Sequence, residues 1–222
     1  RWGRGAIDGG GCAGIGRLEL IEGGRERAGA WGMERGVSRP VAALEELQGD
    51  VVIGADGLNS LIRRNFEKEL APTLTHFNNR FAWFGAERAF DTLTQSFKAT
   101  PDGAFNAHHY RYAPNRSTFI VECEDATYKN FGFDTMSEAE SAKACEAIFA
   151  DVLQGASLIT NRSTWRQFPK LWCNKWTSGR YALLGDAVHT AHFSIGSGTR
   201  LALEDAIAMV HALSTHETIA EA

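Results

Sequence analysis

Short apolar runs bounded by glycine alternate with a helical pattern along this chain of 222 residues. Two of the runs, Val51–Ile53 and Tyr181–Leu184, each lead into an aspartate beside a glycine. Such runs are typical of buried strands. From Thr199 onward, apolar residues recur at helical spacing, at positions 203, 206, 207, 210 and 213. The pattern therefore predicts two buried strands and a long final helix, with Ser197 as its N-cap.

Aromatic, alternating runs between the two buried strands predict an antiparallel sheet. These runs are Arg80–Phe84, Leu93–Phe97, Ala104–Tyr112 and Ser117–Val121. Ser137-x-x-Glu140 is a capping box, and it predicts a helix whose apolar stripe continues to Leu153. Residues 161–172 are again strand-like.

Glycine dominates the first part of the chain. Gly9-x-Gly11-x-x-Gly14 has the spacing of a dinucleotide fingerprint, but no hydrophobic strand precedes it, so we do not interpret it as one. Residues 17–47 are expected to be only partly helical, because Gly23-Gly24 and Gly29 interrupt the pattern. Pro40 is expected to open a turn or a short helix over residues 41–47.

Composition and charge exclude several classes of protein. A formal net charge of −4 without a block of Lys or Arg argues against a general nucleic-acid binder. No apolar run reaches the roughly 18 residues of a membrane span. The four cysteines form no CxxC pair, so neither a zinc site nor a disulfide framework is indicated, and a reducing cytoplasm fits best.

The richest candidate site is the segment from Gly185 to Thr199. It places Asp186 at the carboxyl end of a strand, where ligands of open α/β sheets bind. A loop with Gly196 and Gly198 follows, and then a helix N-terminus, which attracts negative charge. A carboxylate and a helix dipole aimed at one spot suit a ligand that has a polyol and an electron-rich ring.

A metal site is a competing interpretation of the same segment, because Asp186, His189 and His192 are spaced three apart. We predict no metal, since the glycine-rich segment cannot form one helix that aligns these ligands and no cysteine supports them. An ordinary strand, loop and helix with packing glycines is the other alternative.

A family resemblance favours the cofactor interpretation. Its residues are Gly185-Asp186-Ala187, His189, Gly196, Gly198 and Asp205-Ala206. They resemble the GD motif of the FAD-dependent aromatic hydroxylases, the flavoprotein monooxygenases. The resemblance implies that Asp186 holds the ribityl chain of FAD. It also implies that the glycine loop and the helix start at Thr199 face the pyrimidine edge of the flavin.

One departure from the family pattern points to a branch. The family usually has proline before the glycine loop, whereas this chain has His192-Phe-Ser-Ile195. The run Ala191–Thr199 looks like the branch with salicylyl-CoA 5-hydroxylase and anthraniloyl-CoA monooxygenases, which implies an aromatic acyl-CoA as substrate. On the substrate-side strand of that branch, His109 and Arg111 are the candidate substrate contacts.

Two further stretches carry the same resemblance. Asp56-Gly57-x-x-Ser60-x-Ile-Arg63 resembles the family's DG motif, which touches FAD and is linked to NAD(P)H binding. Gly14-Ile-Gly-Arg17, followed by a helix, resembles the segment in which an arginine reaches the FAD phosphates, so Arg17 is implied in that contact.

The resemblance implies an α/β (α+β) fold with a partial Rossmann-like FAD-binding layer and an inserted antiparallel substrate-side sheet. We expect part of the FAD-binding layer in residues 1–72. The sheet and its helix are expected in residues 73–176, and the remaining FAD-binding part in residues 177–222. The family's first βαβ unit has no counterpart here, so a partial domain is expected.

The predicted function is that of an FAD-dependent aromatic monooxygenase that uses O2 and NADH or NADPH. No side chain is given a catalytic role, because the flavin carries the chemistry. The alternatives are another flavin oxidoreductase of this fold, or a non-catalytic remnant that holds no FAD.

Overall fold

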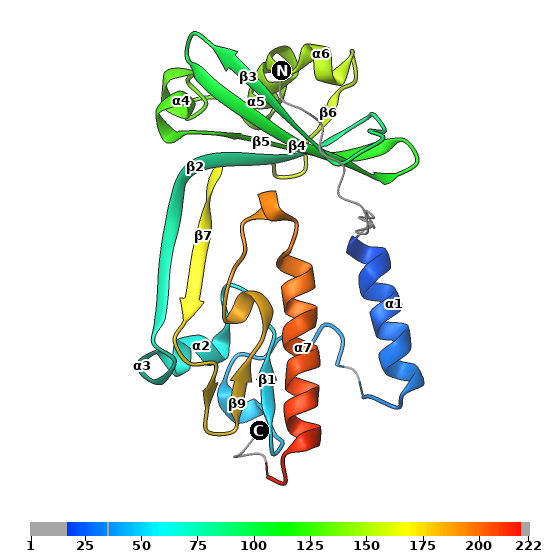
Figure 1. Ribbon diagram of the computed structural model, residues 1–222, viewed down its shortest axis with the longest axis vertical. Coiled ribbons are helices and arrows are strands. Elements are labelled where there is room, and N and C mark those ends of the chain that lie inside the picture. The colour runs from blue at the N-terminus through cyan, green and yellow to red at the C-terminus, as the bar shows by residue number, and fades with distance from the viewer. Residues whose placement is uncertain (1–16, 35, 219–222) are drawn as a thin grey trace. The chain divides into compact units, whose positions relative to one another are not determined.

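Contacts between residues divide the chain into two compact units. The structure, a computed structural model, describes residues 17–34 and 36–218 (Figure 1). One unit, here called the sheet unit, contains the described residues before 35 together with residues 78–166. The other, here called the turn unit, contains residues 36–77 and those from 167 onward. Cys12 and the glycines at 9, 11 and 14 lie outside the described residues.

An antiparallel sheet forms the body of the sheet unit, as predicted. Its strand order is β3-β4-β5-β2-β6. The strands are β2 (Pro72–Ala86), β3 (Thr94–Thr100), β4 (Gly103–Ala113), β5 (Arg116–Cys123) and β6 (Leu158–Ile159). The sixth member of the sheet, β7 (Arg166–Cys173), pairs with β2 outside this order. The short strand β6 was not predicted, because two residues give no alternation to detect.

Alternation along the strands gives one sheet face an aromatic core. Phe105 on β4 lies opposite Cys123 on β5, and Phe84 on β2 lies opposite Phe119 on β5. All four residues are buried in one hydrophobic cluster, and Phe149 packs into the same cluster. The interdigitated rings account for the aromatic runs of the sequence, because large apolar side chains contribute most of the buried area.

Three short helices follow β5 in the sheet unit. They are α4 (Asp125–Asn130), α5 (Glu138–Ile148) and α6 (Ala150–Leu153). The predicted capping box at the start of α5 is confirmed, since Ser137 and Glu140 cap each other's backbone N–H groups. The predicted stripe to Leu153 belongs to two helices, because Phe149 leaves helical geometry at their junction.

A helix, α1 (Arg17–Ala30), runs without interruption through Gly23-Gly24 and Gly29. The expectation that these glycines would break the helix was therefore wrong. Each glycine lowers helix stability by about 1 kcal/mol relative to alanine, which is a penalty and not a block. No residue of α1 is buried. Further on, the short helix expected after Pro40 is a single turn of 3-10 helix, η1 (Leu44–Glu46).

The turn unit is built on a small mixed sheet with strand order β1-β9-β8. Its strands are β1 (Val52–Gly54), β8 (Thr177–Ser178) and β9 (Tyr181–Leu183). β1 and β9 run parallel, with Val52 opposite Tyr181 and Gly54 opposite Leu183. Both predicted strands are therefore confirmed as strands, and they are neighbours, but β1 is not buried throughout, since Ile53 is 45% exposed. Their core includes Ile62 and Leu70 from α2 (Leu61–Asn65) and α3 (Glu67–Leu70).

The long helix α7 (Gly198–Thr215) confirms the helix predicted from Thr199 onward. Figure 1 shows it beside the turn that follows β9, and Ala202 comes within 3.0 Å of where a Cβ on Gly185 would lie. Ser197 occupies the N-cap position, but it makes no side-chain cap hydrogen bond and its backbone is already helical. Among the described residues, no helix is both long and apolar enough to cross a membrane.

The apolar stripe of α7 faces away from the core of the turn unit. Leu203 is 59% exposed, Ile207 69% and Val210 66%, while α7 has no buried residue. The helix packs through its small residues, as the close approach of Ala202 to Gly185 shows. Periodicity predicted the helix correctly, but it does not say which face the rest of the chain covers.

Candidate functional site

Two aspartates mark the carboxyl ends of the parallel strands in the turn unit. Asp56 follows β1 by two residues and Asp186 follows β9 by three. Because β1 and β9 are parallel neighbours in register, both aspartates lie at the same edge of the small sheet. Both side chains are exposed. This is the edge at which open α/β sheets bind their ligands.

The loop after β1 is held by caps on the short helix α2. The carboxylate of Asp56 accepts a hydrogen bond from the Leu61 N–H at 2.7 Å. The hydroxyl of Ser60 accepts one from the Arg63 N–H at 3.2 Å. Gly57 has a φ of +77°, and no atom lies within 4 Å of where its Cβ would be. The loop therefore offers open, glycine-lined backbone beside a fixed carboxylate.

The turn after β9 exposes Asp186 and buries its neighbours. It forms the 3-10 turn η2 (Gly185–Ala187), in which Gly185 and Ala187 are buried. Gly185 has a φ of +59°, and a Cβ there would meet the Cβ of Ala202 at 3.0 Å. Among the described residues, no hydrogen bond or ion pair engages the carboxylate of Asp186. This carboxylate can therefore accept hydrogen bonds from a ligand.

Arg63 joins the two loops. Its side chain is buried, and its guanidinium donates to the carbonyl of Ala187 at 2.6 Å and to the carbonyl of Leu58. One residue from α2 thus connects the loop after β1 to the turn after β9. Arg63 belongs to the motif that begins at Asp56, but the sequence alone indicated no role for it. Its position beside Ile62, in a segment expected to pack on a strand, was the available signal.

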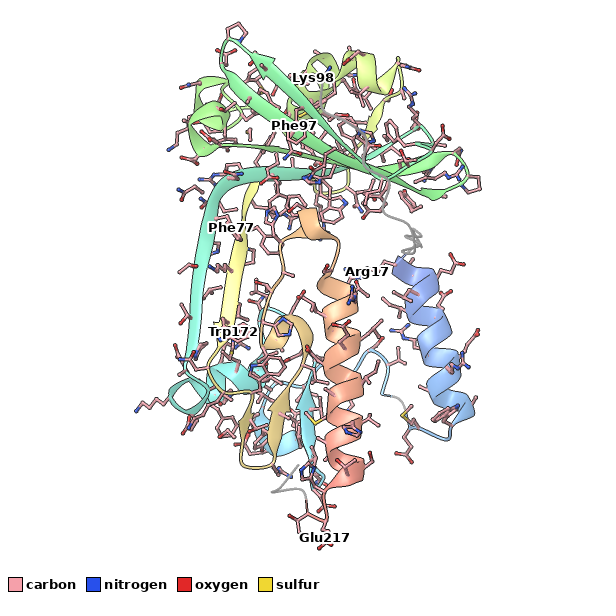
Figure 2. All side chains as sticks on the ribbon, viewed as in Figure 1. Arg17, Phe77, Phe97, Lys98, Trp172 and Glu217 are labelled. Atoms are coloured by element: carbon pink, nitrogen blue, oxygen red, sulfur yellow. The ribbon has the colours of Figure 1, made fainter. Side chains whose placement is uncertain are left out.

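A second polar residue, Asp205 on α7, holds the turn from the other side. Its Oδ2 accepts from the Gly185 N–H at 2.8 Å and lies 2.9 Å from Nε2 of His189. The imidazole of His189 packs against Trp176, with 5.1 Å between ring centroids, and against Trp172, with 6.1 Å. Trp172, labelled in Figure 2, lies on β7. These contacts fix both ends of the turn that carries Asp186.

The glycine loop before α7 leaves its backbone open. His192 caps the 3-10 turn η3 (Phe193–Ile195), which ends at Gly196 with a φ of +66°. A Cβ added to Gly196 or Gly198 would meet no atom within 4 Å. Thr199 is exposed in the first turn of α7. The first turn of a helix carries backbone N–H groups without helical partners, and these donors attract an electron-rich or anionic group.

The arrangement fits the riboflavin half of a flavin cofactor. Asp186 supplies an acceptor for hydroxyl groups, the start of α7 supplies donors, and the open glycines at 57, 196 and 198 leave room for a flat ring. Among the residues that the structure describes, no three His, Cys, Asp or Glu side chains gather as metal ligands. The donors, the acceptor and the open backbone together match a polyol joined to a flat ring.

Seven of the predicted cofactor residues belong to the turn unit. They are Asp56, Gly57, Gly185, Asp186, Gly196, Gly198 and Thr199. The register of β1 and β9 brings the first four to one sheet edge, and the packing of α7 on the turn after β9 brings the other three to the same unit. The remaining cofactor residue, Arg17, is the exposed first residue of α1 in the sheet unit, and its contact with FAD stays a prediction.

The two predicted substrate residues lie on β4 of the sheet unit. His109 is 3% exposed and stacks on Phe119. Its Nε2 forms a hydrogen bond with the hydroxyl oxygen of Ser96 at 2.9 Å. Burial, together with the positive charge of Arg88, lowers the pKa of His109 to about 4. Arg111 is exposed beside a bulge in the β4–β5 pairing. His109 has the contacts of a structural residue, and the substrate role of both residues stays a prediction.

Comparison with known proteins identifies a family for this chain. The model of the family described as FAD binding domain matches residues 35–220. Salicyloyl-CoA 5-hydroxylase of a Streptomyces species is 37% identical over 216 residues, which are 93% of this chain and 42% of the relative. The 3-hydroxy-4-methyl-anthranilyl-(aryl-carrier protein) 5-monooxygenase of Streptosporangium sibiricum is 39% identical over 85% of this chain and 51% of its own length. The chain thus spans about half the length of these curated relatives.

Solved structures agree on the fold. The tetrameric form of 2-methyl-3-hydroxypyridine-5-carboxylic acid oxygenase matches with a TM-score of 0.59 over 79% of this chain and 47% of that chain. The sequence identity in this match is 17%, so the likeness concerns the fold alone. The mixed α/β architecture, with one antiparallel sheet and a small mixed sheet, is therefore shared with a known oxygenase.

Proposed function

This chain belongs to the FAD-binding monooxygenase family, and we propose that its turn unit holds the riboflavin half of FAD. The observation that carries this proposal is the meeting of Asp56 and Asp186 at one edge of two parallel strands. The turn unit forms part of a Rossmann-like FAD-binding layer in this proposal. The family match covers both motifs from which the site was predicted.

Each part of the site has a role in binding. The carboxylate of Asp186 accepts hydrogen bonds from the ribityl hydroxyls, since no described residue engages it. The open backbone at Gly57, Gly196 and Gly198 allows the ring and its tail to approach closely. Arg17 reaches the phosphate side of the cofactor.

Charge at the start of α7 favours the reduced cofactor. A helix N-terminus stabilises a nearby negative charge by about 0.3–1 kcal/mol at an exposed site. Thr199 and Gly198 place this positive end of the dipole beside the glycine loop. When bound and reduced by NADH or NADPH, FAD supplies the oxygen activation that hydroxylates an aromatic ring. The residues of this chain bind and orient the cofactor.

We propose an aromatic acyl thioester as the substrate. Two relatives support this, since their names specify a CoA thioester and an aryl-carrier-protein substrate. The loop sequence His192–Ile195, which replaces the family's proline, supports the same branch. The antiparallel sheet of the sheet unit is the proposed substrate side, with His109 and Arg111 on it. A cytoplasmic location, where NADH and NADPH are available, is part of the proposal.

The test begins with the purified chain mixed with FAD and then desalted. Retained visible flavin absorbance is expected, and its absence would show that this chain holds no FAD. NADH or NADPH oxidation is then measured with and without a benzoyl-type CoA thioester, together with hydroxylated product and hydrogen peroxide. Substrate-stimulated oxidation with hydroxylated product supports a monooxygenase. Peroxide without hydroxylated product would indicate an oxidase instead.

A further inference from the structure

The carboxylate of Asp205 on α7 is largely shielded from solvent and serves two donors at once. The side chain of Asp205 is 10% exposed, and its Oδ2 accepts from the Gly185 N–H at 2.8 Å. The same oxygen lies 2.9 Å from Nε2 of His189, which must carry the proton because a carboxylate only accepts. Burying a carboxylate is costly unless such donors surround it. Asp205 is therefore held by two specific hydrogen bonds and differs from a solvent-exposed ion pair.

His189 is itself held in place by its surroundings. Its side chain is 11% exposed and lies 5.1 Å, between centroids, from the ring of Trp176. Its backbone N–H donates to the carbonyl of Gly185 at 3.0 Å, and the residue forms an isolated bridge with Trp172. The imidazole therefore presents Nε2 to Asp205 from a fixed position.

The two donors of Asp205 flank Asp186. Gly185 immediately precedes it, and His189 lies three residues beyond it. Arg63 fixes a third point between them through the carbonyl of Ala187. Hydrogen bonds therefore hold the turn before, within and after Asp186. The backbone of Asp186 is fixed by them, and its exposed side chain extends toward a ligand from a defined position.

We propose that Asp205 is a positioning residue that sets the turn so that Asp186 can bind the ribityl chain of the flavin. This inference rests on the proposed function and deepens it. We propose no direct contact between Asp205 and the cofactor. It acts through the Gly185 amide and the His189 ring, and Asp186 is the group that meets the ligand.

A double-mutant cycle separates positioning from general stability. Riboflavin is the probe, and its dissociation constant is measured by fluorescence quenching. Losing hydrogen bonds to a buried charge weakens an interaction by roughly ten- to a hundredfold, so Asp205→Ala is expected to weaken binding within that range. Asp186→Ala weakens binding too, and the double variant is expected to be no weaker than the weaker single variant. Additive losses would mean that Asp205 acts independently of Asp186 and would overturn the proposal.

Matched variants control the cycle. Asp205→Asn keeps one oxygen that can accept from both donors, so it is expected to restore most of the affinity. Glu204→Ala removes an exposed acid from the neighbouring position of α7, where Glu204 pairs with Arg200, and no change in affinity is expected. If Asp205→Ala does not fold, His189→Phe keeps a ring beside Trp176 but removes one donor. His189→Phe is then expected to lose less riboflavin affinity than Asp205→Ala would, and to cause no further loss when Asp186 is already alanine. An unchanged riboflavin affinity in His189→Phe would overturn the proposal.

Hydrogen exchange provides a readout that needs no flavin. In Asp205→Ala, or in His189→Phe in its place, the amides from Gly185 to His189 are expected to exchange faster, while those in the middle of α7 and in β1 are unchanged. Equal acceleration everywhere, or none at the turn, would overturn the positioning role. If the unmodified chain binds no riboflavin, the proposed function fails for this chain, and the exchange result alone decides whether Asp205 positions the turn.

Discussion

His109 is a buried histidine of β4 whose surroundings change its protonation. Its ring packs against those of Phe90 and Phe119, with centroids 4.1 and 5.4 Å away, while the substrate contact that the resemblance implies for it stays a prediction. Burial beside Arg88 lowers the pKa of His109 from 6.5 to about 4. The residue is therefore neutral at physiological pH and belongs to the core of the sheet unit.

The lowered pKa of His109 predicts a pH-dependent stability. Between about pH 6.5 and about pH 4, the unfolded chain binds a proton at His109 that the folded chain does not. Stability therefore falls as pH falls through this window, by on the order of 3 kcal/mol in all. Urea unfolding at a series of pH values checks this, with His109→Gln as the comparison. If both proteins lose the same free energy on acidification, His109 is not the responsible group.

Arg63 gives a prediction about how the two loops are connected. Arg63→Lys retains the charge but loses the planar fork that reaches the carbonyls of both Leu58 and Ala187. We expect the free energy of unfolding to fall by about 2 kcal/mol, since one buried carbonyl loses a charged donor. Urea denaturation measures this change. Arg64→Lys, at the exposed neighbouring position, is the control and should be neutral.

At the level of single residues, the sequence indicated an exposed polar group more readily than contacts within the protein. Asp186 was predicted from its motif, and the structure leaves its carboxylate exposed. Arg63 and Asp205 received no role, because their partners are backbone atoms 124 and 20 residues away. Such pairs depend on the tertiary fold, and local spacing does not reveal them.

The secondary-structure elements agreed with the sequence prediction where local hydrogen bonds determine them, as at the start of α5. There Ser137 and Glu140 form the reciprocal pair that the motif requires. Ser137→Ala is expected to lower the free energy of unfolding by about 1 kcal/mol, because one N–H at the helix start loses its acceptor. Chemical denaturation measures the loss. Ser137→Asp, which restores a capping oxygen, should recover most of it, and a neutral Ser137→Ala would show that the cap contributes nothing.

Other elements departed from the sequence pattern for identifiable reasons. α1 continues through Gly23-Gly24, because glycine weakens a helix without forbidding it. α7 has the predicted helical period, but Leu203, Ile207 and Val210 are more than half exposed. A periodic stripe shows that a helix is amphipathic, and the burial of that stripe depends on which other segments pack against it.

At the scale of the whole molecule, the order of motifs was more informative than any motif alone. The strands that precede Asp56 and Asp186 pair although their partners are 129 residues apart in the sequence, since Val52 lies opposite Tyr181 and Gly54 opposite Leu183. A sequence pattern could predict both strands, but only the family resemblance indicated that they would be neighbours. The division into a sheet unit and a turn unit arises because residues 78–166 are inserted between them. The expected three-part boundaries at 72 and 176 stay a prediction.

The most direct test of the account is the affinity of this chain for FAD with and without the carboxylate of Asp186. Titration of FAD, followed by the change in flavin fluorescence, gives the dissociation constants of the unmodified chain, of Asp186→Ala and of Asp50→Ala. Asp50 is an exposed acid of the same unit and serves as the control. The account predicts that Asp186→Ala binds FAD about tenfold or more weakly, while Asp50→Ala binds it normally. Equal affinity in all three proteins would contradict the assignment of the flavin site.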